Sequence, residues 1–331
     1  MRRLRVCVTL KDASYLSGMF VIADQSEMLN AFTVDVEDYF QVTGFENDIP
    51  RQKWNQFESR VEFNTLRLLE LLERYDVKAT FFVLGWIADQ FPDLVKAISE
   101  AGHEIGSHSY WHRLIYTLTP QEFQRDLARS RDVLHAVTGQ PITSFRAPSF
   151  SITERSRWAL AELSKAGFKT DSSIYPIKHD RYGMPGANTR IHTITTEHGD
   201  ISEMPMTVRK VAGVSVPVSG GGYFRLYPQK FTSKLLKRVN RSGEPFVFYI
   251  HPWELDAGQP RLKAGTAISR WRHYLNLEST ESKLRHILQE FEFGPLSKVI
   301  AESQGIEANR TSDSLEIHSS QIPTVEHSQH Q

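Results

Sequence analysis

Cysteine is nearly absent from the sequence: Cys7 is the only one among 331 residues. One cysteine cannot form an intrachain disulfide, and it cannot build a zinc site from several thiolates. Net charge is also missing, because 39 lysines and arginines balance 39 aspartates and glutamates, for a formal charge of +0. The chain as a whole therefore has no field that attracts nucleic acid, and we expect no nucleic-acid partner. This sum says nothing about local patches of charge.

Long hydrophobic runs are absent as well. No apolar run approaches the roughly 18 residues that a membrane-spanning helix needs, so we expect no transmembrane segment. The first five residues, Met1 to Arg5, resemble the charged start of a signal peptide. Lys11, Asp12 and Ser17 interrupt the apolar stretches that follow, and no small-residue cleavage site comes after them. We therefore expect a cytoplasmic protein, either free or peripheral to the inner membrane, with secretion as the alternative.

The two ends of the chain differ in composition from the part between them. Residues 1–27 precede Met28, which stands just before the first clear strand. We interpret them as an extension that is disordered or that results from a start codon assigned too early. Residues 302–331 are rich in Ser, Glu, Gln and His without periodic apolar positions, which predicts a disordered polar tail. Residues 28–301 should form one domain, since no linker divides them; the pattern gives no oligomeric state.

Between the ends, short apolar segments alternate with helical patterns, and this alternation predicts an α/β fold with a parallel sheet or barrel. Helices are expected over Val61–Arg74, over Phe91–Ala101, and from the capping-box sequence at Thr119 to Gly139. The predicted strands are Ala31–Val36, Ala79–Leu84, Glu104–Ser107, Ser144–Ala147, Lys169–Ser172, Ser202–Met206 and Phe246–His251.

Two histidines, His108 and His112, follow one of these strands. Residues four apart share one face of a helical turn, so both imidazoles could reach one cation. Core packing explains many such pairs. The position at the end of a strand favours a ligand site, because α/β folds place ligands there.

Three acidic residues, Asp35, Glu37 and Asp38, lie within four positions at the end of the first strand. Side chains alternate along a strand, so Asp35 and Glu37 point to one side while Asp38 begins the exit loop. Their mutual repulsion calls for a cation or a shared proton. A solvated turn is the alternative interpretation.

Two further strand ends carry Arg146 and His251. Arg146 could hold a carboxylate ionised through a bidentate pair, or could be part of a structural ion pair. His251 could be catalytic or a neutral core histidine. Together the four strand ends supply nitrogen and oxygen ligands, a base and an acid, the set that metal-assisted hydrolysis requires.

At these residues the sequence resembles the polysaccharide deacetylase family, also called carbohydrate esterase family 4 or the NodB homology domain. The resemblance extends over residues 29–300 and is closest to the subgroup associated with exosortase systems. It rests on Val34–Val42, His108–His112, Arg146–Phe150, Ser219–Phe224 and Ile250–Glu254. The family implies a distorted (β/α) barrel of about seven parallel strands and the removal of N-acetyl groups from a sugar polymer. The subgroup implies a role in exopolysaccharide biosynthesis.

The resemblance also implies roles for individual residues. Asp35 matches the family's catalytic base, Arg146 the residue that orients it, and His251 the general acid. His108 and His112 match the metal-binding histidines. The implied cofactor is one divalent metal, zinc in the first place, with cobalt or nickel as alternatives.

The third metal ligand is less clear, because many family members have two adjacent aspartates where this chain reads Asp-Val-Glu-Asp. Strand alternation favours Glu37, and the family's pattern keeps Asp38 open. Some relatives with a changed first motif lack the metal. A metal-free amidase acting on a small cyclic amide or ureide is therefore one rival function, and a catalytically inactive carbohydrate-binding barrel is another.

The expected substrate is an N-acetylated polysaccharide or a lipid-linked oligosaccharide. A backbone N–H within residues 110–112 is expected to stabilise the oxyanion. Aromatic rings beside the site could stack on sugars or could merely anchor loops. The candidate substrate-binding residues are Tyr110, Trp111, Pro148, Tyr223 and Trp253, and Phe224 is a further candidate for stacking.

Overall fold

The structure, a computed structural model, describes residues 28–179 and 181–305. The extension predicted for residues 1–27 lies outside this part of the chain, as does the predicted tail from residue 306 onward. Residues 302–305, which were expected to belong to the tail, instead continue a helix over residues 296–305. This helix is tied to the sheet, since Gln304 Nε2 donates to Ser202 Oγ at 3.0 Å.

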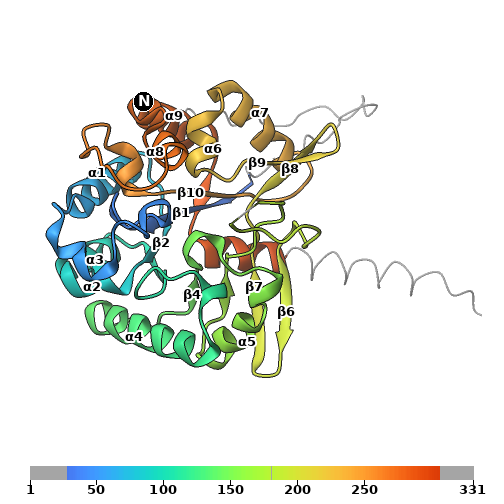
Figure 1. Ribbon diagram of the computed structural model, residues 1–331. Coiled ribbons are helices and arrows are strands. Elements are labelled where there is room, and N and C mark those ends of the chain that lie inside the picture. Colours follow the sequence, from blue (N-terminus) through green and yellow to red (C-terminus); the bar gives the residue numbers. More distant parts are fainter. Residues whose placement is uncertain (1–27, 180, 306–331) are drawn as a thin grey trace, which may run out of the picture.

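A nine-stranded sheet curls through the centre of the molecule (Figure 1). Its neighbours run in the order β10-β1-β2-β3-β4-β5-β7-β6, and β11 pairs with the start of β1. The strands of this sheet are β1 (Asn30–Val36), β2 (Thr80–Val83), β3 (Glu104–Ser107), β4 (Ser144–Phe145), β5 (Thr170–Asp171), β6 (His192–Thr196), β7 (Gly199–Glu203), β10 (Val247–Ile250) and β11 (Phe293–Gly294).

The seven predicted strands correspond to β1, β2, β3, β4, β5, β7 and β10, and their pairings with one another are all parallel. The distorted barrel with about seven parallel strands is thus confirmed. Among the described residues the curled sheet remains open, because β6 and β10 form its two edges. The carboxyl ends of parallel strands meet at one rim, so the motifs that follow β1, β3, β4 and β10 converge there.

Two antiparallel hairpins contain strands that the sequence analysis did not predict. One pairs β6 with β7, and the other pairs β8 (Val208–Val211) with β9 (Val214–Pro217). The strands β6, β8 and β9 keep most of their residues partly or fully exposed. Strands that bury little apolar surface lack the alternation that marks a strand in the sequence, which is why they escaped prediction.

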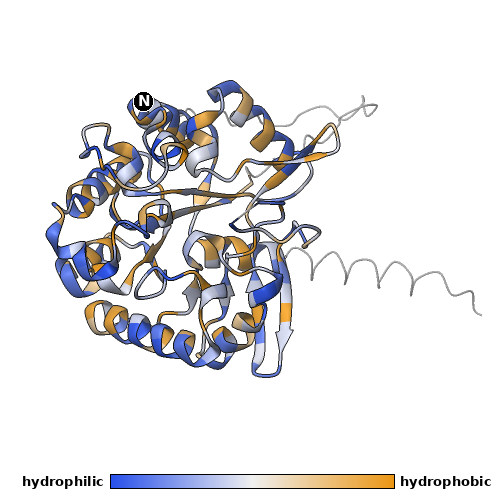
Figure 2. Cartoon of the chain, in the orientation of Figure 1, coloured by the Kyte–Doolittle hydropathy of each residue, from blue (hydrophilic) through white to orange (hydrophobic). Residues whose placement is uncertain are grey.

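Helices cover the outer face of the sheet and turn their apolar sides toward it (Figures 1 and 2). The large apolar cluster lies between these two layers, and a smaller one that includes Phe82, Tyr175 and Tyr249 fills the inside of the curl. Besides the helix over residues 296–305, the described α-helices are α1 (Val61–Arg74), α2 (Gly85–Gln90), α3 (Pro92–Glu100), α4 (Pro120–Thr138), α5 (Trp158–Lys165), α6 (Gly221–Leu226), α7 (Gln229–Asn240), α8 (Ala267–Tyr274) and α9 (Leu277–Glu290).

The predicted boundaries of α4 agree with its observed caps. The Thr119 side chain accepts from the Glu122 backbone N–H, and the Glu122 carboxylate accepts from the Thr119 backbone N–H at 2.9 Å. At the other end Gly139 takes a left-handed conformation with φ 68°. Glycine adopts this conformation without the steric cost of a side chain, so the helix ends there.

Replacing Thr119 by alanine removes one half of this capping box. The Thr119→Ala variant should lose about 1 kcal/mol of unfolding free energy, the usual value of a helix cap. Urea denaturation would measure the loss, with Thr189→Ala, at an exposed threonine outside the helices, as control. Equal midpoints for the two variants would contradict a stabilising role for the cap.

Candidate active site

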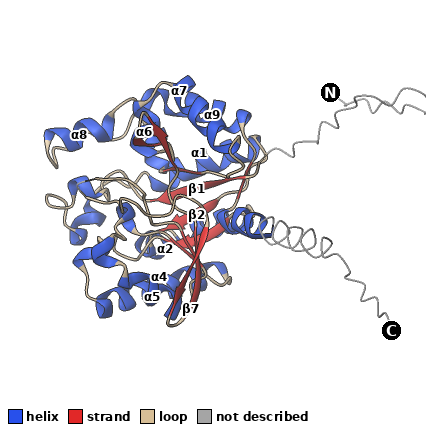
Figure 3. Cartoon of the chain, turned by 90° about the vertical axis from the view of Figure 1, so that its right-hand side faces the viewer, coloured by secondary structure: helices blue, strands red, loops and turns tan. Residues whose placement is uncertain are grey.

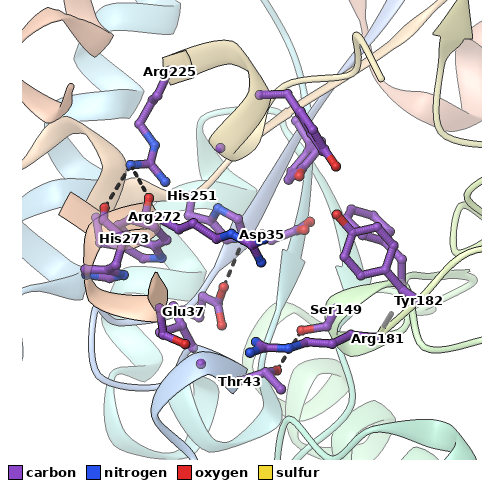
Figure 4. Close-up of a pocket in the computed structure, with 18 of the residues that line it drawn as sticks. Asp35, Glu37, Thr43, Ser149, Arg181, Tyr182, Arg225, His251, Arg272 and His273 are labelled. Atoms are coloured by element: carbon purple, nitrogen blue, oxygen red, sulfur yellow. Dashed lines mark hydrogen bonds and ion pairs between the residues drawn. The ribbon is translucent and has the colours of Figure 1, made fainter. Parts of the chain in front are cut away.

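The rim of the sheet holds a pocket of about 430 Å³ (Figure 4). Five of the predicted catalytic and metal-binding residues line it: Asp35, Glu37, His108, His112 and His251. They come from the ends of β1, β3 and β10, as the parallel arrangement requires. The residues that the sequence spreads over more than 200 positions thus face one cavity.

Asp35 is fixed by a buried arginine. Its Oδ1 atom accepts from Arg146 Nη1 at 2.9 Å, and its residue is only 2% exposed. Arg146 is fully buried and makes further bonds to Thr33 Oγ1 and to the backbone and hydroxyl oxygens of Ser172. These partners hold the guanidinium in one orientation, with its charge against the Asp35 carboxylate.

Glu37 lies between two histidines. Its Oε1 atom is 3.0 Å from His251 Nε2, and its Oε2 atom is 3.0 Å from His112 Nε2. The contact between His112 Nε2 and Glu37 Oε2 is not a hydrogen bond, so Oε2 is buried without a hydrogen-bond partner in the described structure. Burial alone would raise the pKa of Glu37, but the histidines outweigh it and lower the pKa to about 2.

His108 and His112 face the pocket from an irregular loop, which corrects the prediction of a helical turn. Ser109 and His112 both take left-handed conformations, with φ 65° and 53°. The two imidazole centroids lie 5.4 Å apart. His108 Nδ1 is 2.8 Å from the carbonyl oxygen of Arg146, so Nδ1 carries the proton and Nε2 keeps its lone pair.

Both of these histidines are neutral at neutral pH. Burial lowers the pKa of His108, and it lowers the pKa of His112 to about 4, although Glu37 acts in the opposite direction. The short contact between His112 and Glu37 is therefore not an ion pair at pH 7, and the cation beside Glu37 is His251. Neutral imidazole is the form that binds metals.

His251 is held by acidic groups at both ring nitrogens. Nε2 contacts Glu37, and Nδ1 is 2.7 Å from Glu254 Oε1. Burial would lower the pKa of His251, but the two carboxylates raise it to about 10. Its side chain remains 17% exposed, which leaves the ring accessible from the pocket.

Two residues that the sequence analysis did not select complete this arrangement. Glu254 is fully buried, and its Oε2 accepts from Arg225 Nε at 2.6 Å. Arg225 Nη1 also donates to the carbonyls of Arg272, His273 and Leu275 (Figure 4). The spacing of His251 and Glu254 across a helical turn that starts at Pro252 was the available signal for Glu254. Arg225 is distant from both residues in the sequence, and no signal in the sequence indicated its role.

Asp38 faces away from the imidazoles. Its Oδ2 atom accepts from Ser59 Oγ at 2.6 Å and from the backbone N–H groups of Arg60 and Val61, at the start of α1. Burial raises its pKa to about 6 despite these bonds. Of the two acids that the sequence left open as third ligand, Glu37 is the one that faces the histidines.

The donor set fits a divalent cation in its chemistry. Two neutral imidazoles and a carboxylate are common ligands of zinc, and Glu37 Oε2 is a buried oxygen that lacks a hydrogen-bond partner. Within residues 28–179 and 181–305, however, no three such side chains stand ready around a common point to hold an ion. Glu37 is in contact with both His112 and His251, with one carboxylate oxygen 3.0 Å from each Nε2 atom.

The aromatic candidates separate into two groups. Tyr223 and Trp253 line the pocket. Phe224 packs against Phe248 instead, and Pro148 is buried outside the lining.

Tyr110 and Trp111 also lie outside the lining of the pocket. The Tyr110 hydroxyl donates to Asp89, and Trp111 packs beside Trp54 with ring centroids 6.1 Å apart. Their backbone N–H groups both donate to Asp126, at 2.8 and 3.2 Å. These two N–H groups are therefore engaged, which removes them from the expected oxyanion site.

The N–H of His112 is engaged too, because it donates to Ser109 Oγ at 3.1 Å. Ser149 provides a different candidate at the pocket wall. It and Phe150 take left-handed conformations, with φ 50° and 53°. Strained residues of this kind are typical of functional sites. Ser149 Oγ is also 2.6 Å from Thr43 Oγ1, and this contact fixes the loop of Ser149 against the segment that follows β1.

Comparison with known families divides the chain into two parts. Residues 51–169 match the polysaccharide deacetylase family, and residues 172–301 match a domain of unknown function, DUF3473. His108 and His112 lie in the first part, and His251 lies in the second, so both parts contribute to the pocket wall.

Two curated relatives match shorter stretches. The chain is 34% identical over 96 residues to a peptidoglycan-N-acetylglucosamine deacetylase of Bacillus cereus, which covers 29% of this chain and 35% of that relative. It is 27% identical over 165 residues to a peptidoglycan-N-acetylmuramic acid deacetylase of Bacillus subtilis, which covers 45% of this chain and 62% of that relative. The chain thus spans less than two thirds of either relative.

A crystal structure of a putative polysaccharide deacetylase from Mycobacterium smegmatis has the same fold. The two structures align with a TM-score of 0.55 at 16% identity, over 90% of this chain and 96% of the other.

The raised pKa of His251 predicts a pH dependence for the metal-free protein. A histidine with a raised pKa contributes stability that is complete below its ordinary value of 6.5 and is lost as the pH rises through about 10. Unfolding free energies of chelator-treated protein across this range should fall more steeply for the wild type than for His251→Gln. The exposed His135→Gln variant is the control and should follow the wild type. Parallel curves for all three proteins would refute the raised pKa.

Proposed function

This chain contains a polysaccharide deacetylase domain, and from that premise we propose that it is a metal-dependent hydrolase. It removes N-acetyl groups from hexosamine residues of a polysaccharide. The observation that carries this proposal is the pocket in which Asp35, held by Arg146, faces Glu37, two neutral histidines and the cationic His251. A hydrolase of amides needs a base for water and an acid for the departing amine, and this pocket supplies both.

His108, His112 and Glu37 would hold the metal, with zinc as first choice and cobalt or nickel as alternatives. When bound, such an ion polarises an amide carbonyl and lowers the pKa of water toward neutrality.

Asp35 acts as the general base. Arg146 occupies Oδ1, so the proton of the attacking water goes to the other carboxylate oxygen, Oδ2. The water oxygen forms a bond to the carbonyl carbon, and negative charge collects on the carbonyl oxygen. The Ser149 N–H is our candidate for a donor to that oxygen.

His251 acts as the general acid. Its Nε2–H, which points at Glu37 in the resting arrangement, supplies the proton to the amide nitrogen as the C–N bond breaks. Glu254 accepts from Nδ1–H throughout and stabilises the imidazolium before the transfer. The products are acetate and a free amine on the sugar.

The finer identity of the substrate belongs to the same proposal. The two relatives described above are named as peptidoglycan deacetylases, whereas the motifs at residues 34–42 and 250–254 resemble a subgroup tied to exopolysaccharides. We therefore propose an exopolysaccharide or its lipid-linked precursor as substrate, modified in the cytoplasm or at the inner membrane. Tyr223 and Trp253 would stack on its sugar rings.

Loss of the base should stop turnover. Asp35→Asn should release acetate from N-acetylated oligosaccharides about 100- to 10,000-fold more slowly than the wild type, the usual contribution of a general base. Its metal content, measured by elemental analysis, should remain near the wild-type value because Asp35 is not a proposed ligand. Full activity in this variant would disprove the assignment of the base.

Measurements of metal content should show which of the two neighbouring acids, Glu37 or Asp38, binds the metal. Glu37→Gln should weaken metal binding by more than about tenfold, since even changes beyond the ligands cost that much. Asp38→Asn is the matched control and should retain metal, because Asp38 caps α1. Chelation should abolish acetate release, and zinc should restore it.

Unchanged acetate release after complete removal of metal would overturn the metal dependence and favour the metal-free amidase. Sugar binding without acetate release from any acetylated glycan would favour the inactive barrel.

A further inference from the structure

Helix α8 exposes two large apolar side chains at the edge of the pocket. Ile268 is 63% exposed and Trp271 is 57% exposed. Residues three apart lie on the same side of a helix, so the two side chains form one apolar ridge. Figure 3 shows α8 projecting from the body of the molecule. An exposed apolar ridge on a projecting helix is typical of a docking surface.

The segment that carries this ridge has an excess of positive charge. Residues 257–277 contain Arg261, Lys263, Arg270 and Arg272 and no aspartate or glutamate, although the whole chain has a formal charge of +0. The described structure shows no ion pair for any of the four. Two carboxylates accept backbone hydrogen bonds from this segment: Asp48 accepts from the Gly265 N–H, and Asp256 accepts from the Gly258 N–H.

The opposite side of α8 is fixed to the active site. Ser269 and His273 are buried, and the His273 ring stacks on Trp253 with centroids 4.2 Å apart. Trp253 in turn stacks on His251, at 5.2 Å. The ridge is therefore held in a defined position relative to the catalytic residues, and Trp271 belongs both to the ridge and to the pocket wall.

We propose that α8 and the basic segment before it, residues 261–274, dock this protein onto an anionic lipid membrane. Ile268 and Trp271 enter the headgroup region, where tryptophan is favoured, and the four basic side chains meet lipid phosphates. Because Trp271 and Arg272 line the pocket, its opening then lies beside the membrane surface.

A membrane explains the ridge better than a sugar chain does. Ile268 is the most exposed member of the ridge, yet it does not line the pocket, so a glycan bound in the pocket leaves it in water. An aliphatic side chain also offers a sugar little stacking surface. The combination of apolar ridge and unpaired cations matches the two components of an anionic bilayer interface, its apolar interior and its phosphates.

Co-sedimentation with vesicles tests the proposal on the full chain. Wild-type protein should bind vesicles of phosphatidylcholine mixed with phosphatidylglycerol, and should bind pure phosphatidylcholine vesicles weakly. Added salt should reduce binding. Ile268→Glu should bind about tenfold more weakly, and Arg261→Gln or Lys263→Gln about fivefold more weakly, because each interfacial cation contributes about that factor. Phe63→Glu is the matched control: Phe63 is 61% exposed on α1, away from the pocket, and its loss should leave binding unchanged.

Three outcomes would overturn the proposal. They are the absence of binding to phosphatidylglycerol vesicles, equal binding by the wild type and Ile268→Glu, and equal losses in Ile268→Glu and Phe63→Glu. Retention on heparin without vesicle binding would indicate an acidic polymer as partner instead. The vesicle assay needs no acetylated substrate, so its result is independent of the proposed hydrolase activity. Acetate release from a soluble oligosaccharide should be the same for Ile268→Glu and the wild type.

Discussion

A fully buried arginine, Arg146, is the constraint on which the site depends. A charge without exposure to water is costly, and removing one member of a buried pair typically costs about 3–5 kcal/mol. Asp35 provides the compensating charge, and Thr33 and Ser172 accept further hydrogen bonds from the guanidinium. The Phe82 ring lies 4.4 Å from the guanidinium carbon. Because these partners come from β1, β2 and the end of β5, the curl of the sheet and the orientation of Asp35 depend on one another.

A series of charged side chains in contact with one another links the two halves of the molecule. Glu37 contacts His251, His251 contacts Glu254, and Glu254 contacts Arg225. Glu37 directly follows β1, and the other three residues belong to the part of the chain that matches a domain of unknown function. Arg225 then fixes the carbonyls that lead into α8. The C-terminal half therefore supplies the proposed acid and also sets the position of the proposed membrane-docking helix.

The three acidic residues at and just after the end of β1 have different partners, although they are close in sequence. Asp35 contacts a permanently charged group, Glu37 contacts titratable imidazoles, and Asp38 contacts backbone N–H groups at the start of α1. Burial raises the pKa of Asp38 to about 6, whereas the histidines lower the pKa of Glu37 to about 2. These neighbouring acids thus differ because their partners differ.

The sequence by itself determined the parallel strands, the caps of α4 and the convergence of Asp35, His108, Arg146 and His251. These features depend on local periodicity and on the rule that parallel strands end at one rim. Tertiary structure alone decided that Glu37 faces the imidazoles, that Arg225 supports Glu254, and that Tyr110 is buried away from the pocket. It also placed the histidine pair on an irregular loop and left Ile268 exposed. Each of these depends on contacts between segments far apart in the chain, for which spacing along the sequence carries no signal.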